Sequence, residues 1–304
     1  MATMTTSEVQ LSALPPTGGR AGMRGVLASE FTKLRSVRST YWTVAALLIL
    51  GIGLAAAIAA GTLADLHAHP GDKAGFDATQ VSLGASFELG QLVIAVLGAM
   101  AITSEYSTGM IRTSLTAMPR RGTVYASKLL VFTVSALVIS LVTAFLAFFV
   151  GQAVLSGSGV SASLFHSTTV PMVAQVTPNG AHLSGSYLVT SGAVLGAVVG
   201  AALFVTAAAV IAFGLGAIIR HTAGAIASAI GLLFVLPIII QLLPSTWRFD
   251  LVRFFPSAAG QVLTTTVGAT NQHMWSAWPQ FAVTAIWAVA LVAAGAYLFR
   301  KRDA

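Results

Sequence analysis

Two features of this sequence could carry chemistry, and the first is a short run of metal-binding side chains. Asp65, His67, His69 and Asp72 lie close together in the chain, and carboxylate and imidazole groups are zinc ligands. They fall in a stretch that we expect to be a solvated loop, and no second, distant pair of ligands accompanies them. We therefore do not expect a metal site.

The second feature is an acid inside an apolar segment. Glu88 is the one formal charge within a stretch predicted to cross a membrane. Acids in such positions usually face a cavity and mark a path for substrate or protons. Glu88 lies near the end of its segment, however, where a carboxylate reaches the interface easily. Both interpretations, a substrate path and an interfacial acid, stay open.

Motifs for nucleotide chemistry are missing from the sequence. A P-loop needs Gly-Lys-Ser/Thr, so that backbone amides and a lysine hold the phosphates. The lysines at 33, 73, 128 and 301 follow Thr, Asp, Ser and Arg. No HExxH or GxSxG motif occurs either. We expect no enzymatic activity and no directly bound cofactor, and any ATP hydrolysis that drives this chain must reside on another polypeptide.

Composition indicates a membrane protein. Of the 304 residues, 56% are apolar and only 8% are charged, against about 25% charged residues in an ordinary soluble domain. Mean hydropathy is +0.85, and residues 129–219 carry no formal charge. The net charge of +7 comes from residues beside apolar runs and not from an aromatic-interleaved patch, so nucleic acid is not the expected partner.

Six apolar segments are long enough to cross the roughly 30 Å hydrocarbon layer as helices. The polar residues 1–22 are predicted to be a disordered cytoplasmic tail, and residues 23–304 the transmembrane domain. The predicted crossings are residues 41–64, 83–103, 129–155, 187–219, 222–243 and 279–299. In the fourth crossing, Gly192, Gly196 and Gly200 share one helix face and predict close helix packing.

Basic residues set the predicted orientation, because cytoplasmic loops are enriched in Lys and Arg. Only Lys73, Arg248 and Arg253 fall on one side of six crossings. The other side holds Arg20, Arg24, Lys33, Arg35, Arg38, Arg112, Arg120, Arg121, Lys128, Arg220, Arg300, Lys301 and Arg302. We therefore predict an all-α polytopic protein with both termini in the cytoplasm.

Residues 25–40 precede the first crossing and are predicted to form an amphipathic elbow helix. Leu27, Phe31 and Leu34 follow helical spacing, while Lys33 and Arg35 lie off that stripe. Such a helix can lie on anionic lipid at the inner leaflet, or it can also contact a cytoplasmic partner. The residues leave both interpretations open.

Residues 104–128, between the second and third crossings, form a longer connection than a hairpin needs. Ile111, Leu115 and Met118 repeat at helical spacing, and Pro119 ends this short helix. The apolar stripe could be buried by headgroups, by the elbow helix, or by a soluble subunit. Periodicity does not choose between these partners.

Three motifs resemble the permease subunits of bacterial ABC-2 type transporters. They are TKLRSVRSTYW, the connection SEYSTGMIRTSL…PRRGTVYASKLL, and FFPSAAGQVL before the last crossing. The resemblance covers residues 24–304 and implies a type V exporter-like fold in the cell membrane. It also implies a second permease copy or a homologous permease, two ATP-binding subunits, and an outer re-entrant segment at 244–278. By the same resemblance, a segment that couples ATP hydrolysis to transport contains Glu105, Tyr106, Gly109, Arg112, Pro119, Arg120 and Arg121.

The expected function is therefore an ATP-driven exporter permease that forms its path as a dimer. A secondary transporter coupled to an ion gradient is the alternative, and it would need buried acids or broken helices near the membrane midplane. Only Glu88 offers such an acid. The sequence does not indicate the transported substrate.

Overall fold

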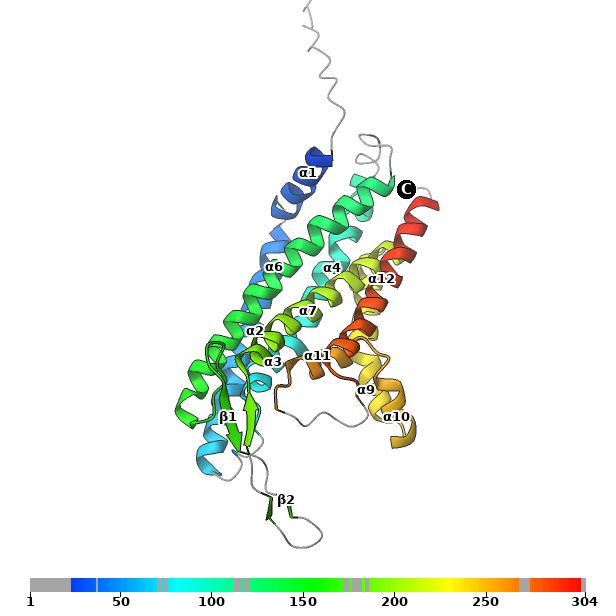
Figure 1. The fold of residues 1–304 in the computed structure, drawn as a ribbon. Helices are drawn as coiled ribbons and strands as arrows, with labels where there is room; N and C mark the ends of the chain where they lie inside the picture. Colours follow the sequence, from blue (N-terminus) through cyan, green and yellow to red (C-terminus); the bar gives the residue numbers. More distant parts are fainter. Residues whose placement is uncertain are drawn as a thin grey trace, which may run out of the picture.

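The computed structural model is a bundle of long helices (Figure 1). It describes residues 23–36, 38–69, 73, 76–111, 116, 121–171, 175–176, 182–183, 186–267 and 274–301. The predicted tail at 1–22 lies outside the described residues. The longer helices are α1 (Met23–Ser36), α2 (Arg38–Ala68), α3 (Ala78–Glu88), α4 (Gly90–Ser107), α6 (Arg121–Leu155), α7 (Ser191–Ile219) and α12 (Ala277–Lys301).

Five helices of the described chain are long and apolar enough to cross a membrane. They coincide with five of the predicted crossings. The fifth of the six predicted crossings, 222–243, consists of α8 (Thr222–Ile230), a π-helical turn (Gly231–Val235) and α9 (Leu236–Gln241). Short helices α10 (Ser245–Val252) and α11 (Ala258–Thr264) follow it within the predicted re-entrant segment.

The predicted crossing at 83–103 is not one continuous helix. The chain breaks at Leu89 into α3 and α4, and neither piece is among the five candidate spans. The amide of Gln91 donates a hydrogen bond to the backbone carbonyl of Glu88 at 3.4 Å, at the point where the helix is interrupted. Glu88 and Gln91, on either side of Leu89, therefore lie at a break in the helix. Hydropathy averaged over the whole segment does not reveal this break.

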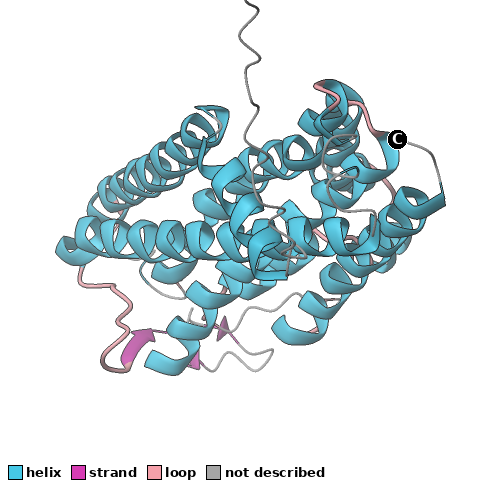
Figure 2. Ribbon diagram, turned by 90° about the horizontal axis from the view of Figure 1, so that it is seen from above, coloured by secondary structure: helices cyan, strands magenta, loops and turns pink. Residues whose placement is uncertain are grey.

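The predicted helix at 187–219 begins later than expected. Residues Ser186–Val189 form strand β4, which pairs antiparallel with β1 (Thr168–Pro171). Thr190 then caps α7, since its side chain accepts a hydrogen bond from the Ala193 amide at 3.1 Å. A second small sheet pairs β2 (Gln175–Val176) with β3 (His182–Leu183). The described chain is therefore mostly helical, with strands at one edge, and not purely α (Figure 2).

Helix α7 is the core of the bundle. In its most apolar window 72% is buried, against 17–28% in the other four candidate spans. Glycines allow this burial: a Cβ at Gly98 of α4 would overlap the Ala209 carbonyl oxygen of α7, and one at Gly214 of α7 would lie 2.8 Å from the Leu291 backbone of α12. Helices α4 and α12 thus approach α7 backbone to backbone.

Only part of the predicted glycine face packs in this way. A Cβ at Gly200 would lie 2.9 Å from Leu263 of α11. At Gly192 and Gly196 a Cβ would meet no described atom within 4 Å. Of the three predicted glycines, only Gly200 lies in a close contact within the described chain, and Gly98 and Gly214 make the other close contacts described above.

We predict that Gly98→Ala destabilises the protein, while Gly192→Ala does not. The added methyl group at position 98 has to separate α4 from α7, and overpacking of this kind typically costs about 1–3 kcal/mol. Thermal unfolding of both variants in the same detergent measures the difference. Equal unfolding temperatures would show that the α4–α7 contact is not tight.

Candidate functional site

Four charged side chains meet near one end of the bundle, where α1 and the C-terminal end of α12 lie (Figure 1). We call it the basic end, because α12 ends there in Arg300 and Lys301 and Arg220 contacts the Leu298 carbonyl of the same helix. The charge cluster consists of Glu30 and Lys33 of α1, Glu105 of α4 and Lys128 of α6. Lys128 Nζ lies 2.6 Å from Glu30 Oε2 and 2.7 Å from Glu105 Oε1. Lys33 Nζ lies 2.8 Å from Glu30 Oε1 and 3.2 Å from Glu105 Oε1. The cluster therefore joins three helices.

Burial makes these contacts strong. The Glu30, Glu105 and Lys128 side chains are 5%, 8% and 9% exposed, whereas Lys33 is 30% exposed. Burial alone would raise the pKa of the Glu30 carboxyl, yet the Lys128 and Lys33 ammonium groups hold that pKa below its usual value. Burial would likewise lower the pKa of Lys33, but hydrogen bonds and charge from Glu30 and Glu105 raise it. Both groups stay ionised at neutral pH.

The cluster adds an attachment that the sequence of the elbow helix did not indicate. The stripe of Leu27, Phe31 and Leu34 was predicted to face lipid or a cytoplasmic partner, and in the structure Phe31 is 54% exposed while Glu30 is buried. Leu27 and Leu34 are partly buried, and Arg35 is exposed. Helix α1 is therefore attached to the bundle through ion pairs, and it presents Phe31 outward.

Some residues of the predicted coupling segment lie within the described chain, and the others lie outside it. The Arg220 guanidinium lies 5.1 Å from the centre of the Tyr106 ring and donates to the Leu298 carbonyl at 3.2 Å, which links the ends of α4, α7 and α12. Gly109 has a positive φ of 71° just after α4, and Ile111 is buried. Arg121 begins α6. Arg112, Leu115, Met118, Pro119 and Arg120 lie outside the described residues.

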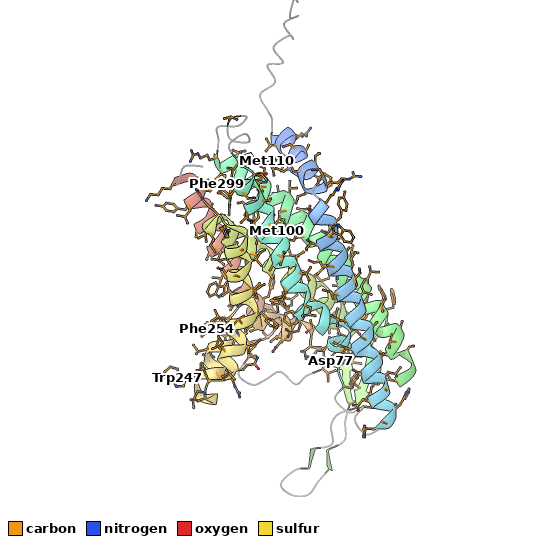
Figure 3. The ribbon with its side chains drawn as sticks, turned by 180° about the vertical axis from the view of Figure 1, so that it is seen from behind. Asp77, Met100, Met110, Trp247, Phe254 and Phe299 are labelled. Atoms are coloured by element: carbon orange, nitrogen blue, oxygen red, sulfur yellow. The ribbon has the colours of Figure 1, made fainter. Side chains whose placement is uncertain are left out.

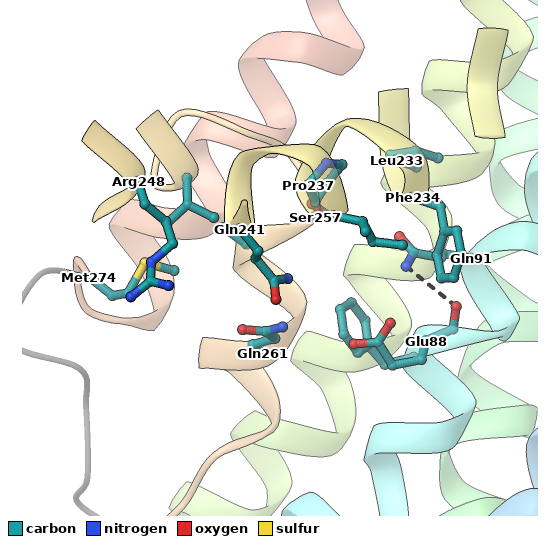
Figure 4. A pocket seen from close by; sticks show the side chains of 14 residues that line it. Glu88, Gln91, Leu233, Phe234, Pro237, Gln241, Arg248, Ser257, Gln261 and Met274 are labelled. Atoms are coloured by element: carbon teal, nitrogen blue, oxygen red, sulfur yellow. Dashed lines mark hydrogen bonds between the residues drawn. The ribbon is translucent and has the colours of Figure 1, made fainter. Parts of the chain in front are cut away.

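A polar cavity of about 340 Å³ lies toward the opposite end, beside the α3–α4 break (Figure 4). Glu88 lines it, and the Gln261 side chain lies beside the Glu88 carboxylate. Gln91, Gln241 and Arg248 also line it. The Oε1 atom of Gln91 is buried without a hydrogen-bond partner among the described residues. Its further lining residues are Phe87, Leu233, Phe234, Pro237, Ile238, Val252, Ser257, Ala258 and Met274.

The chemistry of this polar cavity is hydrogen bonding and charge pairing. Amide groups both donate and accept, and the carboxylate only accepts. Glu88 was identifiable from sequence, as an acid in an apolar segment. Gln241, Arg248 and Gln261 were not, because the folding of α9, α10 and α11 brings them beside Glu88.

Metal-binding side chains do not assemble in the described chain. Asp65 Oδ1 and His69 Nδ1 lie 3.3 Å apart, one helical turn apart in sequence, and both are solvent-exposed. Asp72 lies outside the described residues. No group of three or more His, Cys, Asp or Glu side chains suited to a metal occurs among the residues described.

Comparison with known proteins decides the family. A family model described as "ABC-2 family transporter protein" matches residues 26–247, well over half of the chain. The chain belongs to the ABC-2 transporter family. A comparison with curated proteins found no match. The family and the five apolar helices identify a multi-pass membrane protein, and they confirm the resemblance found in the sequence.

In this ABC-2 protein, a non-helical turn connects α10 to α11, and side chains of α12 satisfy its backbone. Gln280 Nε2 donates to the Arg253 carbonyl at 2.6 Å, and Thr284 Oγ1 donates to the Pro256 carbonyl at 2.8 Å. The indole of Trp287 donates to the Phe254 carbonyl at 2.9 Å. These three donors are spaced along one face of α12, and each satisfies a carbonyl that would otherwise lack a partner in an apolar surrounding.

Asp77 binds the backbone that follows α11, at the other end of the α10–α11 segment. Its Oδ1 accepts hydrogen bonds from the amides of Thr79 and Gln80, both at 3.0 Å, and so caps α3. Its Oδ2 accepts from the amides of Thr266 and Val267, just after α11. Sequence analysis missed Asp77, although an Asp directly before the first residue of a helix is a recognisable N-cap signal.

We predict that Glu30→Gln lowers the unfolding temperature of the ABC-2 chain in a pH-dependent manner. Because the Glu30 pKa is lowered in the folded state, its stabilisation is present above its usual value of 4.5 and is lost as the pH falls through the folded value. The gap between wild type and variant should be constant near neutral pH and close under acid.

For the matched variant Lys33→Met, the difference in unfolding temperature from wild type should close at high pH and not under acid. The Lys33 pKa is raised, so its contribution should persist up to its usual value of 10.5 and be lost as the pH rises through the folded value. Thermal unfolding monitored across the pH range measures both variants. A gap for Glu30→Gln that does not change with acid would contradict the ion-pair assignment.

We also predict that Thr284→Val loosens the α10–α11 turn. The isosteric change leaves the buried Pro256 carbonyl unpaired, at a cost of about 1–3 kcal/mol. Thr62→Val is the control, because Thr62 donates to the Ile58 carbonyl of its own helix. Hydrogen exchange of α11 amides should quicken in Thr284→Val alone. Equal exchange in the two variants would refute the anchoring role of Thr284.

Proposed function

We propose that this ABC-2 protein is the membrane-spanning permease subunit of an ATP-driven exporter. The basic end then faces the cytoplasm in the cell membrane, because thirteen of the sixteen Lys and Arg residues fall on that side of six predicted crossings. Since the chain has no Gly-Lys-Ser/Thr motif, ATP hydrolysis belongs to a separate ATP-binding subunit. A second permease copy or a homologous permease completes the path.

The observation that carries this proposal is the charge cluster. Glu105 lies near the end of α4 and Lys128 near the start of α6, so the cluster flanks the connection between these helices. Both residues pair with α1. A force on the connection is therefore passed to α1, α4 and α6 together, because displacing one member would leave a buried charge without its partner. An ATP-binding subunit docked on residues 104–128 could use this linkage.

A secondary transporter remains the second candidate, and the polar cavity favours it. The crossing that contains Glu88 is broken at Leu89, and a π-helical turn with Pro237 just beyond it interrupts the facing segment. Discontinuous helices around an acid are the arrangement that ion-coupled transporters use. Reconstituted vesicles separate the two candidates: an exporter needs ATP and its partner, whereas a secondary transporter responds to an imposed ion gradient and loses that response in Glu88→Gln.

We predict that Leu115→Asp uncouples the ATP-binding partner from the permease. Leu115 belongs to the apolar stripe predicted from the sequence and lies outside the described residues. A charge there should prevent the stripe from being buried against a soluble subunit. Thr113→Asp, on the opposite side of the same predicted helix, is the control. ATPase activity of the co-purified complex should fall to that of the isolated ATP-binding subunit only in Leu115→Asp. Unchanged stimulation would rule out docking through this stripe.

A further inference from the structure

The polar cavity is lined by charged and amide side chains that a ligand can reach. Glu88 and Arg248 are partly exposed, and Gln241 and Gln261 are exposed. These four side chains differ in this respect from Gln91, whose Oε1 atom is buried. The cavity volume of about 340 Å³ falls within the range of about 300–1,000 Å³ that is usual for small-molecule sites.

The two formal charges that line the cavity have opposite signs and lie apart. In Figure 4, Glu88 lies at one side and Arg248 at the other, with Gln241 and Gln261 between them. Among the described residues, no other Asp, Glu, Lys or Arg lines this cavity. A ligand that carries a positive and a negative group pairs with both charges, whereas a singly charged ligand pairs with one only. The lining therefore matches a zwitterion.

The side chains at each end define the two charged groups of that zwitterion. The planar guanidinium of Arg248 suits bidentate binding of a phosphate. The Glu88 carboxylate offers acceptors only, and the amide of Gln261 beside it offers a further acceptor. A primary ammonium brings three N–H donors to these acceptors, while a quaternary ammonium brings none. An α-amino acid carries both charges on one carbon, so an aminoethyl phosphate fits the separated pair better.

The cavity lies at the depth of lipid headgroups and borders the hydrocarbon. Trp247, directly before Arg248, is 68% exposed, and Figure 3 places it at the end of the bundle away from Met110. Exposed indoles mark the membrane interface. Ile238 in the cavity wall and Ile239 beside it are 47% and 50% exposed, so α9 presents apolar surface to lipid. A lipid can therefore place its headgroup in the cavity while its chains lie along α9.

We infer that the polar cavity binds a phospholipid whose headgroup carries a phosphate and a primary ammonium. The phosphate pairs with Arg248, the ammonium pairs with Glu88 and Gln261, and the acyl chains lie against Ile238 and Ile239. Since α4, α9, α10 and α11 meet around this cavity, the bound headgroup joins the predicted re-entrant segment to the bundle. This inference goes beyond the proposed function, because it names a ligand of the permease chain and needs neither ATP nor an ion gradient.

Native mass spectrometry of the full chain in detergent tests the choice of headgroup. The chain is titrated with dioleoyl phosphatidylethanolamine, phosphatidylcholine and phosphatidylglycerol. Phosphatidylethanolamine should bind about tenfold more tightly than the other two, because loss of a hydrogen bond to a charged group has at least this effect. Equal binding of the three lipids, or tighter binding of either comparison lipid, would overturn the inference. Displacement of phosphatidylethanolamine by equimolar O-phosphoethanolamine would assign the site to a soluble zwitterion and overturn the lipid as ligand.

Variants show whether the bound lipid occupies this cavity. Glu88→Gln should weaken phosphatidylethanolamine about tenfold and leave phosphatidylglycerol unchanged, whereas Arg248→Gln should weaken both lipids. Gln261→Leu, which removes the second acceptor, serves if Glu88→Gln does not fold. Asp65→Asn and Arg35→Gln are matched controls, because both residues are exposed and neither lines the cavity. Unchanged affinities in the cavity variants, or equal losses in the controls, would refute the site.

Discussion

Polar groups within the apolar part of this protein depend on partners inside the chain, because hydrocarbon offers none. The α10–α11 turn meets this demand through three donors on α12. Asp77 meets it for the amides that begin α3 and follow α11. At the basic end, two carboxylates and two ammonium groups form ion pairs with one another and attach α1. Hydrogen bonds and ion pairs near helix ends therefore connect segments that are distant in the sequence.

Between these polar joints, the bundle is held by close contact around α7. Gly98 on α4 and Gly214 on α7 let neighbouring backbones approach to distances that a side chain would prevent. Lipid competes with apolar side chains for apolar partners, so the fit of surfaces, more than the hydrophobic effect, favours association of helices in a membrane. Helix α7 is accordingly covered on several sides, whereas the other candidate spans turn most of their surface outward.

Five of the predicted crossings coincide with long apolar helices in the structure, because each is a long apolar run. It did not predict the interruption at Leu89, since one acid and one amide barely change the average over the window. It also missed strand β4, where an apolar run continues into α7 across the Thr190 cap. The apolar stripe of α1 likewise gave no sign of the long-range ion pairs that attach this helix to the bundle.

For the charge cluster and the polar cavity, the sequence revealed single residues and not their partners. Glu88 was identifiable from its setting, and Glu105 from the family resemblance. Their partners were not, because Lys33 lies 72 positions from Glu105, and Gln261 lies beside Glu88 only after α11 folds back. Tertiary structure, which local periodicity does not encode, brings these groups together.

The link between α7 and α8 is short enough to restrict how these two helices move relative to each other. Arg220 and His221 alone separate the two helices, and Arg220 adopts a left-handed conformation while it contacts the Tyr106 ring and the Leu298 carbonyl. A turn this short leaves no slack. A displacement of the α4 end near Tyr106 would therefore move the start of α8, and the π-helical turn after α8, which contributes Leu233 to the wall of the distant polar cavity, is where the segment can bend.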